Sequence, residues 1–283
     1  MARMNEQPSA RPESSLPLER TIGAMITTAG ALLARSLGII LLIVAWEAVA
    51  RSGAVTAFLL PTFSATLERI WNDTLSGDLI GNLGVTIYRS LAGFLIATVL
   101  GIGLGTLMSR IRVIRWFFDP IISVGFPMPK IAFLPIVILW LGFYDVPKIS
   151  MVAVEAIFPV VTATLIGIQG VERELLWSAR NMGANEREVV WHVVVPAAFP
   201  QIMTGLQVAL PIALIVAIVT EMLMGGYGVG GAMINASRLA DSRGVFAGIV
   251  EIAVIGFIMV KGMALLRRRM LLWHHEALEP TTV

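Results

Sequence analysis

The sequence predicts an all-α integral membrane protein with about six transmembrane helices. Of its 283 residues, 57% are hydrophobic and only 14% are charged, whereas about a quarter of the residues in a soluble globular domain are charged. The apolar residues also gather into runs of ~20, the length that a helix needs to cross a bilayer. The six runs are residues 32–50, 85–107, 117–141, 149–168, 202–223 and 245–266.

Residues 1–30 are predicted to be a disordered cytoplasmic leader, because prolines and alternating charges leave little apolar surface to bury. Residues 31–80 are expected to hold the first spanning helix and an amphipathic stretch outside the cytoplasm. Trp46 and Glu47 stand where a signal peptidase requires small residues. The first apolar run is therefore interpreted as an uncleaved span.

Three segments carry further local predictions. Prolines in the run 117–141 predict a kink or break near residues 127–130. Gly101 and Gly105 form a GxxxG pair, which predicts close packing against another helix. Residues 56–78 are too polar to span, and their helically spaced apolar residues predict a surface helix. These apolar residues are Leu67, Ile70, Trp71 and Leu75.

The arginines predict the orientation in the membrane. Twelve lie in the leader, in the loop after the second span, in the polar segment near residue 180 and after the last span. In a six-span protein these four regions share one side, and loops rich in Lys and Arg remain in the cytoplasm. We therefore expect both termini, including the tail 271–283, and the polar segment to be cytoplasmic.

Residues 171–205 form this polar segment between two apolar spans. Residues 172–182 have the apolar spacing of a helix, and Gly183 suits the position that ends it. Asn185, with a glutamate three residues later, forms a capping pair for a second helix, which Pro196 is expected to stop. We expect another protein to bind this helix–glycine–helix segment.

Charged residues inside spans are costly and are therefore candidates for function. Glu155 and Glu221 are the deepest, and we consider them candidates for the translocation pathway. The alternative is that each pairs with another group inside the helix bundle. Arg89 lies four residues into its span and is expected at the membrane interface, while Glu47 and Lys261 lie near span ends, where they can reach water.

The sequence offers no catalytic or metal-binding constellation. It has no cysteine, and its three histidines lack the spacing of metal ligands. The loop 225–231 contains the pattern G-x-G-x-x-G, but it follows a span rather than a strand, so we interpret it as a flexible or tightly turned loop outside the cytoplasm. Without a basic face interleaved with aromatic residues, no nucleic-acid partner is predicted.

Several motifs resemble the permease subunits of ABC importers of type I. Ala179-Arg180-x-x-Gly183-Ala184, followed by Val195-Pro196-x-Ala198-x-Pro200, is similar to the EAA signature of that family. Other segments resemble the branch that handles sulfonates, taurine, nitrate and thiamine precursors. They include Leu60-Pro61-Thr62, Thr86-x-x-Arg89-Ser90, Pro127-x-Pro129-Lys130, Phe158-Pro159, Glu221-Met222 and Gly228-x-Gly230.

The resemblance implies a MetI-like transmembrane domain over residues 81–270, with a coupling loop at 171–199. It implies two copies of the permease, two ATPase subunits that bind ATP and magnesium, an extracytoplasmic binding protein and a bacterial-type inner membrane whose lipid surrounds the chain. The permease itself would bind no cofactor. The residues implied to contact the ATPase are Glu174, Ala179, Arg180, Gly183, Ala184 and Pro196.

One departure from the family concerns this loop. Trp177-Ser178-Ala179 stands where the family has Glu-Ala-Ala, although Glu174 lies one helical turn earlier. The implied cargo is a small polar or anionic solute, either a sulfonate, taurine or nitrate, or a thiamine or pyrimidine precursor. A self-contained ion-coupled transporter is the alternative function, but it would leave the helix–glycine–helix segment unexplained. A membrane enzyme would lack a catalytic constellation.

Overall fold

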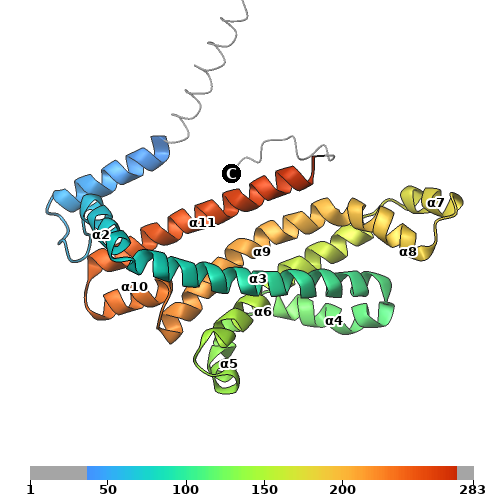
Figure 1. Cartoon of the computed structure of the whole chain (residues 1–283), viewed down its shortest axis with the longest axis horizontal. Helices are drawn as coiled ribbons and strands as arrows, with labels where there is room; N and C mark the ends of the chain where they lie inside the picture. The colour runs from blue at the N-terminus through green and yellow to red at the C-terminus, as the bar shows by residue number, and fades with distance from the viewer. Residues whose placement is uncertain (1–36, 273–283) are drawn as a thin grey trace, which may run out of the picture. The chain divides into compact units, whose positions relative to one another are not determined.

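The structure of the chain, a computed structural model, describes residues 37–272 (Figure 1). The described part consists of helices and turns and contains no strand, as the predicted fold class requires. The chain divides into two compact units, Met1–Ser64 and Ala65–Val283. In the first unit residues 37–51 are helical, and the Trp46 indole donates a hydrogen bond to the carbonyl of Pro61 at 2.9 Å. The predicted leader 1–30 and most of the tail 271–283 lie outside the described residues.

The second unit is built almost entirely from helices in chain order. A 3₁₀ turn, Lys130–Phe133, precedes α5, and a π-helical turn, Val189–Val194, precedes α9. The helices are α2 (Phe63–Ser76), which starts two residues before the unit boundary, α3 (Asp78–Arg110), α4 (Arg112–Gly125), α5 (Leu134–Leu141), α6 (Asp145–Gln169), α7 (Arg173–Asn181), α8 (Glu186–Glu188), α9 (Val195–Met224), α10 (Val229–Arg238) and α11 (Ser242–Met270).

Four of the six predicted spans are confirmed as helices long and apolar enough to cross a membrane. Within residues 37–272 these are Asp78–Arg110, Asp145–Gln169, the run Glu186–Arg238 that contains α9, and Ser242–Met270. The predicted span 117–141 is broken, as the prolines suggested. Its two halves, Arg112–Gly125 and Lys130–Leu141, are bent by 95°. The predicted span 32–50 begins outside the described residues.

Glycines of α3 bring its backbone close to α6. At Gly93, Gly101 and Gly105 the nearest atom of α6 to an added Cβ would lie at 2.5–2.7 Å, closer than real Cβ contacts. Ala97, which is fully buried, continues the same row. Residues four apart share a helix face, so these positions form one stripe of small residues. The packing predicted for Gly101 and Gly105 is confirmed, and its partner is α6 of the same chain.

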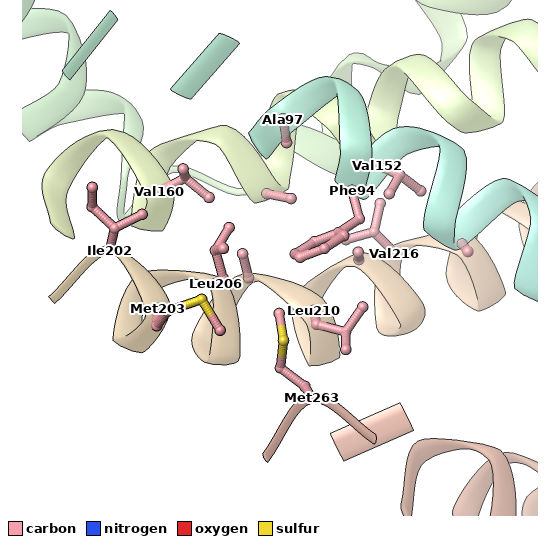
Figure 2. Close-up of a cluster of buried hydrophobic side chains, with 14 of the residues drawn as sticks. Phe94, Ala97, Val152, Val160, Ile202, Met203, Leu206, Leu210, Val216 and Met263 are labelled. Carbon is pink, nitrogen blue, oxygen red and sulfur yellow. The ribbon is translucent and has the colours of Figure 1, made fainter. Parts of the chain in front are cut away.

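The main hydrophobic core lies where α3, α6, α9 and α11 meet (Figure 2). The ring of Phe94 points from α3 toward α9, and Met263 reaches the same core from α11. Leu206 and Leu210 contribute from α9 on the facing side. Within the second unit, α7 and α8 lie at one end and α10 lies at the other (Figure 1). We refer to these as the α7 end and the α10 end.

Candidate functional site

At the α7 end, a compact bracket is formed by α7, α8, the turn between them and the π-helical turn Val189–Val194. Its small apolar core consists of Ala179, Val189 and Val194, all of which are buried. This core joins α7 to the π-helical turn that follows α8. The bracket is therefore a folded element with its own packing rather than a loose loop.

A glycine ends α7 in the way that the sequence predicts. Gly183 has φ +87°, the left-handed conformation that glycine adopts without steric cost. The N–H of Gly183 bonds to the carbonyl of Arg180 at 3.0 Å, and the N–H of Ala184 bonds to that of Ala179 at 3.1 Å. This pair of bonds is a Schellman motif. It fixes the direction in which the chain leaves α7.

A capping box begins α8, which confirms the predicted capping pair. The side chain of Asn185 accepts hydrogen bonds from the backbone N–H groups of Arg187 and Glu188, both at 3.0 Å. The carboxylate of Glu188 accepts one from the N–H of Asn185 at 2.8 Å. An ion pair between Arg180 and Glu186, at 3.0 Å, links the two helices across the turn.

The expectation that Pro196 stops the second helix is wrong. The helical run continues through Pro196 into α9 without a break. Proline cannot donate a backbone hydrogen bond, and its ring collides with the carbonyl four residues earlier in a regular α-helix. Here the residues just before it form a π-helical turn, in which the N–H of Val195 bonds to the carbonyl of Val190. The wider turn accommodates the ring.

The outer surface of the bracket carries large apolar side chains. Trp177, Met182 and Trp191 are 58%, 79% and 68% exposed. Glu174, in the first turn of α7, is exposed as well. Exposed aromatic residues and methionine on a rigid element are typical of protein-binding surfaces. Of the predicted coupling residues, the structure therefore gathers all but Pro196 on the bracket.

At the α10 end, Arg89 joins three helices through its guanidinium group. Its Nη1 lies 2.8 Å from Oε1 of Glu221 on α9, and its Nε and Nη2 lie 2.8 and 2.6 Å from Oδ1 of Asp145 on α6. The hydroxyl of Thr86 lies 2.9 Å from the other oxygen of Glu221. We call Thr86, Arg89, Asp145 and Glu221 the Arg89 clamp.

The Arg89 clamp is deeply buried on one side only. The side chain of Glu221 is 0% exposed and that of Arg89 is 6% exposed, whereas that of Asp145 is 50% exposed. A charge this deep requires a partner, because desolvating an unpaired ion costs several kcal/mol. The guanidinium supplies that partner for Glu221 and reaches toward solvent through Asp145.

Side chains of α3, α6 and α9 hold the glycine loop, residues 225–231, by five of its backbone groups. Arg89 donates to the carbonyl of Tyr227 at 2.6 Å, and Thr86 accepts from the N–H of Val229 at 2.9 Å. The remaining bonds are Lys148 to the Gly225 carbonyl at 3.0 Å, the Gly228 N–H to Asn82 at 2.9 Å and the Gly230 N–H to Glu221 at 3.1 Å.

The composition of the glycine loop follows from this close fit. At Gly228, where φ is +117°, an added Cβ would overlap the carboxylate of Glu221, and at Gly230 it would overlap the carbonyl of Ile218. Of the two predictions for this loop, flexible or tightly turned, the structure therefore supports the second. Because its glycines have no side chains, the backbone of the loop can contact the buried carboxylate of Glu221.

The second pathway candidate, Glu155, is also paired. Its carboxylate lies 3.0 Å from the ammonium group of Lys130. The same ammonium group donates to the carbonyls of Gly125, Phe126 and Met128, at 2.8, 3.4 and 3.2 Å. Lys130 thereby satisfies carbonyls that the break after α4 leaves without helical partners.

The sequence did not indicate the partners of Arg89. Arg89 is buried beside Glu221, and its expected position at the membrane interface stays a prediction. Its partners lie 56 and 132 residues away in the chain, so no local pattern indicates them. The available signal was the pair of opposite charges, Arg89 and Glu221, each in an apolar run, since buried charges need partners.

Comparison with known proteins identifies the family. The family of binding-protein-dependent transport system inner membrane components matches residues 97–272. A putative aliphatic sulfonates transport permease, SsuC of Bacillus subtilis, is 34% identical over 83% of this chain and 85% of its own length. The taurine transport system permease TauC of Escherichia coli is 29% identical over 83% and 87%.

Solved structures of ABC transporters share the fold. The inward-facing MetNI methionine ABC transporter matches with a TM-score of 0.58 at 15% identity, over 65% of this chain and 92% of that one. An amino acid ABC transporter matches with a TM-score of 0.57 at 19% identity, over 69% and 95%. The chain belongs to the family of binding-protein-dependent transport system inner membrane components, and it is a multi-pass permease subunit of an ABC importer.

Proposed function

We propose that the bracket, which lies within the predicted coupling loop 171–199, is the element through which an ATPase subunit drives this permease. The observation that carries the proposal is the combination of two capped helix ends with exposed apolar side chains. The Schellman motif at Gly183 and the capping box at Asn185 make the bracket stiff. Trp177, Met182 and Trp191 give the bracket an exposed apolar surface on which the ATPase subunit can bind. A stiff element transmits a displacement that a loose loop would absorb.

This chain has Trp177 where the family signature has a glutamate, and the bracket suggests which residue takes over its contact. Arg180 is engaged with Glu186 inside the bracket, so Glu174 is the acidic group left on the exposed face of α7. We propose that Glu174 and the three exposed apolar residues form the contact, while Ala179, Gly183 and Ala184 set its shape. Pro196, the second residue of α9, shapes the junction between the bracket and α9.

A pair of substitutions at Gly183 tests this assignment. No atom lies within 4 Å of a Cβ added there, so a side chain would act only through the backbone conformation. Valine in the left-handed region costs ~1–2 kcal/mol or more, whereas asparagine tolerates this conformation. We expect Gly183→Val to insert normally but to lose co-purification with the ATPase subunit and ATP-driven uptake. Gly183→Asn should retain both. If Gly183→Val binds its ATPase and transports like the native chain, the assignment is wrong.

The complete importer, in this proposal, contains two copies of this chain, two ATPase subunits and a solute-binding protein. Both termini and the α7 end face the cytoplasm, and the α10 end faces the binding protein. The arginine distribution supports this orientation. Because the chain has no cysteine, single cysteines introduced at each end can be labelled from either side of the membrane. Labelling at the α7 end from outside would contradict the orientation.

For the solute we propose a small sulfonate, with taurine as the first probe. Two of the relatives are named for aliphatic sulfonates and taurine, whereas another, RibX of Chloroflexus aurantiacus, is named for riboflavin at 29% identity. Uptake of radiolabelled taurine by proteoliposomes with the complete importer tests the proposal. Uptake that needs an ion gradient but no ATP would instead favour the ion-coupled alternative.

For Glu155 and Glu221, the contacts support pairing inside the bundle rather than direct contact with solute. Each carboxylate has a cationic partner within 3.0 Å, and Glu221 is fully enclosed. We therefore propose that both shape the elements beside the pathway. A substitution that selectively changes the preference among solutes would contradict this role.

A further inference from the structure

The glycine loop links an exposed side chain to the buried part of the Arg89 clamp. Tyr227 is 80% exposed, whereas Val229, two residues further, is 0% exposed. The backbone between them is fixed by Arg89 and Thr86. One short segment therefore passes from the surface to the junction of α3, α6 and α9.

We propose that Arg89 is a positioning residue for transport: the Arg89 clamp holds α3, α6, α9 and the glycine loop together as one rigid body throughout the transport cycle. This inference rests on the proposed function, because it concerns movement within the assembled importer. It assigns Arg89 no contact with the solute. The residue acts by keeping the glycine loop and three helices in a fixed relation.

The burial of the clamp is the first argument for a rigid body. Drawing α3 away from α9 would leave Glu221 without a cation in apolar surroundings. Losing one partner of a buried ion pair is strongly unfavourable, by on the order of a hundredfold or more in an equilibrium constant. A cycle that opened the clamp at every turnover would meet this barrier each time.

The tight glycine contacts are the second argument. Gly93 packs on α6 at Val152, and Gly205 of α9 packs on α6 at Ala163, with no space for a Cβ at either contact. By contrast, α4 has no buried residue and is separated from α5 by the 95° break. Movement within the subunit is therefore easier along α4 than inside the body, while the ion pair of Lys130 with Glu155 holds the break itself.

Cysteine labelling tests the proposal, since the native chain has no cysteine. Tyr227→Cys and Val229→Cys are prepared separately in the assembled importer and treated with a membrane-impermeant maleimide added outside. We expect rapid labelling of Tyr227→Cys and no labelling of Val229→Cys. The result should be the same at rest, with ATP and during turnover. Labelling of Val229→Cys that appears only during turnover would overturn the proposal.

A second set of variants tests Arg89 itself. Adding Arg89→Gln to Val229→Cys should raise the labelling rate by at least about tenfold and reduce uptake. Arg89→Lys keeps the charge but cannot reach Glu221, Asp145 and Tyr227 at once, so it should restore part of the protection. Lys130→Gln removes the cation that pairs with Glu155 and serves as the matched control. It should leave Val229→Cys protected.

All labelling is measured on folded, monodisperse protein. If Arg89→Gln does not fold, Asn82→Ala replaces it, because it removes only the hydrogen bond to Gly228. Equal labelling with Arg89→Gln and Lys130→Gln, or continued protection with Arg89→Gln, would overturn the proposal. Labelling of Tyr227→Cys only from the ATPase side would instead contradict the proposed orientation, and the protection of Val229→Cys would still report on the clamp.

Discussion

Adding one methyl group to α3 at two neighbouring glycines measures how much of the fold depends on its approach to α6. Gly101→Ala places a Cβ 2.7 Å from Cγ1 and 2.8 Å from Cβ of Val160, whereas nothing lies within 4 Å of a Cβ at Gly103. Both changes gain similar helix propensity, ~1 kcal/mol relative to glycine. The difference between the variants therefore isolates the packing.

Overpacking of this size costs ~1–3 kcal/mol. With ~2–4 °C per kcal/mol for chains of comparable size, Gly101→Ala should unfold about 2–12 °C below Gly103→Ala. The assay is thermal unfolding of detergent-solubilised protein at one scan rate, since membrane proteins commonly unfold irreversibly. Val160→Ala should recover part of the difference in the double variant. Equal midpoints for the two glycine variants would refute the packing argument.

Three further predictions concern the bracket and the second ion pair. Asn185→Ala removes both bonds of its side chain and should cost ~1 kcal/mol, detected as faster proteolytic cleavage between α7 and α8; unchanged cleavage would argue against a stabilising cap. Trp191→Ala should leave thermal unfolding unchanged, because its side chain is exposed, but should weaken co-purification with the ATPase; full retention would exclude it from the contact. Lys130→Gln should destabilise the fold by ~3–5 kcal/mol, and adding Glu155→Gln should recover part of that loss; a double variant less stable than the single one would contradict the pairing.

The sequence predicts best those features whose causes are local. Gly183, Asn185 and Glu188 act through backbone groups within five residues, so their spacing alone predicts the bracket. Pro196 is the instructive failure. The effect of proline depends on the backbone before it, and the π-helical turn is not visible in residue types.

Features that depend on distant residues could be predicted only in kind. The GxxxG pattern indicated close packing, but not that Val160 and Thr164 of the same chain provide the partner surface. The cost of buried charge indicated that Glu221 needs a partner, but not that Arg89 is that partner. Which helices meet is decided by the complete set of packing contacts, and no single segment of the chain contains that information.

The ion pair between Lys130 and Glu155 also constrains how the chain enters the membrane during synthesis. A lysine at the centre of a spanning helix opposes insertion by ~2.5–3.5 kcal/mol, and an aspartate does the same, so Lys130 at a break between helices opposes insertion by less. Lys130 lies at the break after α4, whereas its counter-charge arrives 25 residues later on α6. The segment that contains α4 and Lys130 therefore enters the bilayer most favourably once α6 has been synthesised. We thus expect α4 and α6 to leave the translocon as a single unit, in which the side chain of Lys130 already binds the free carbonyls at the break and the carboxylate of Glu155.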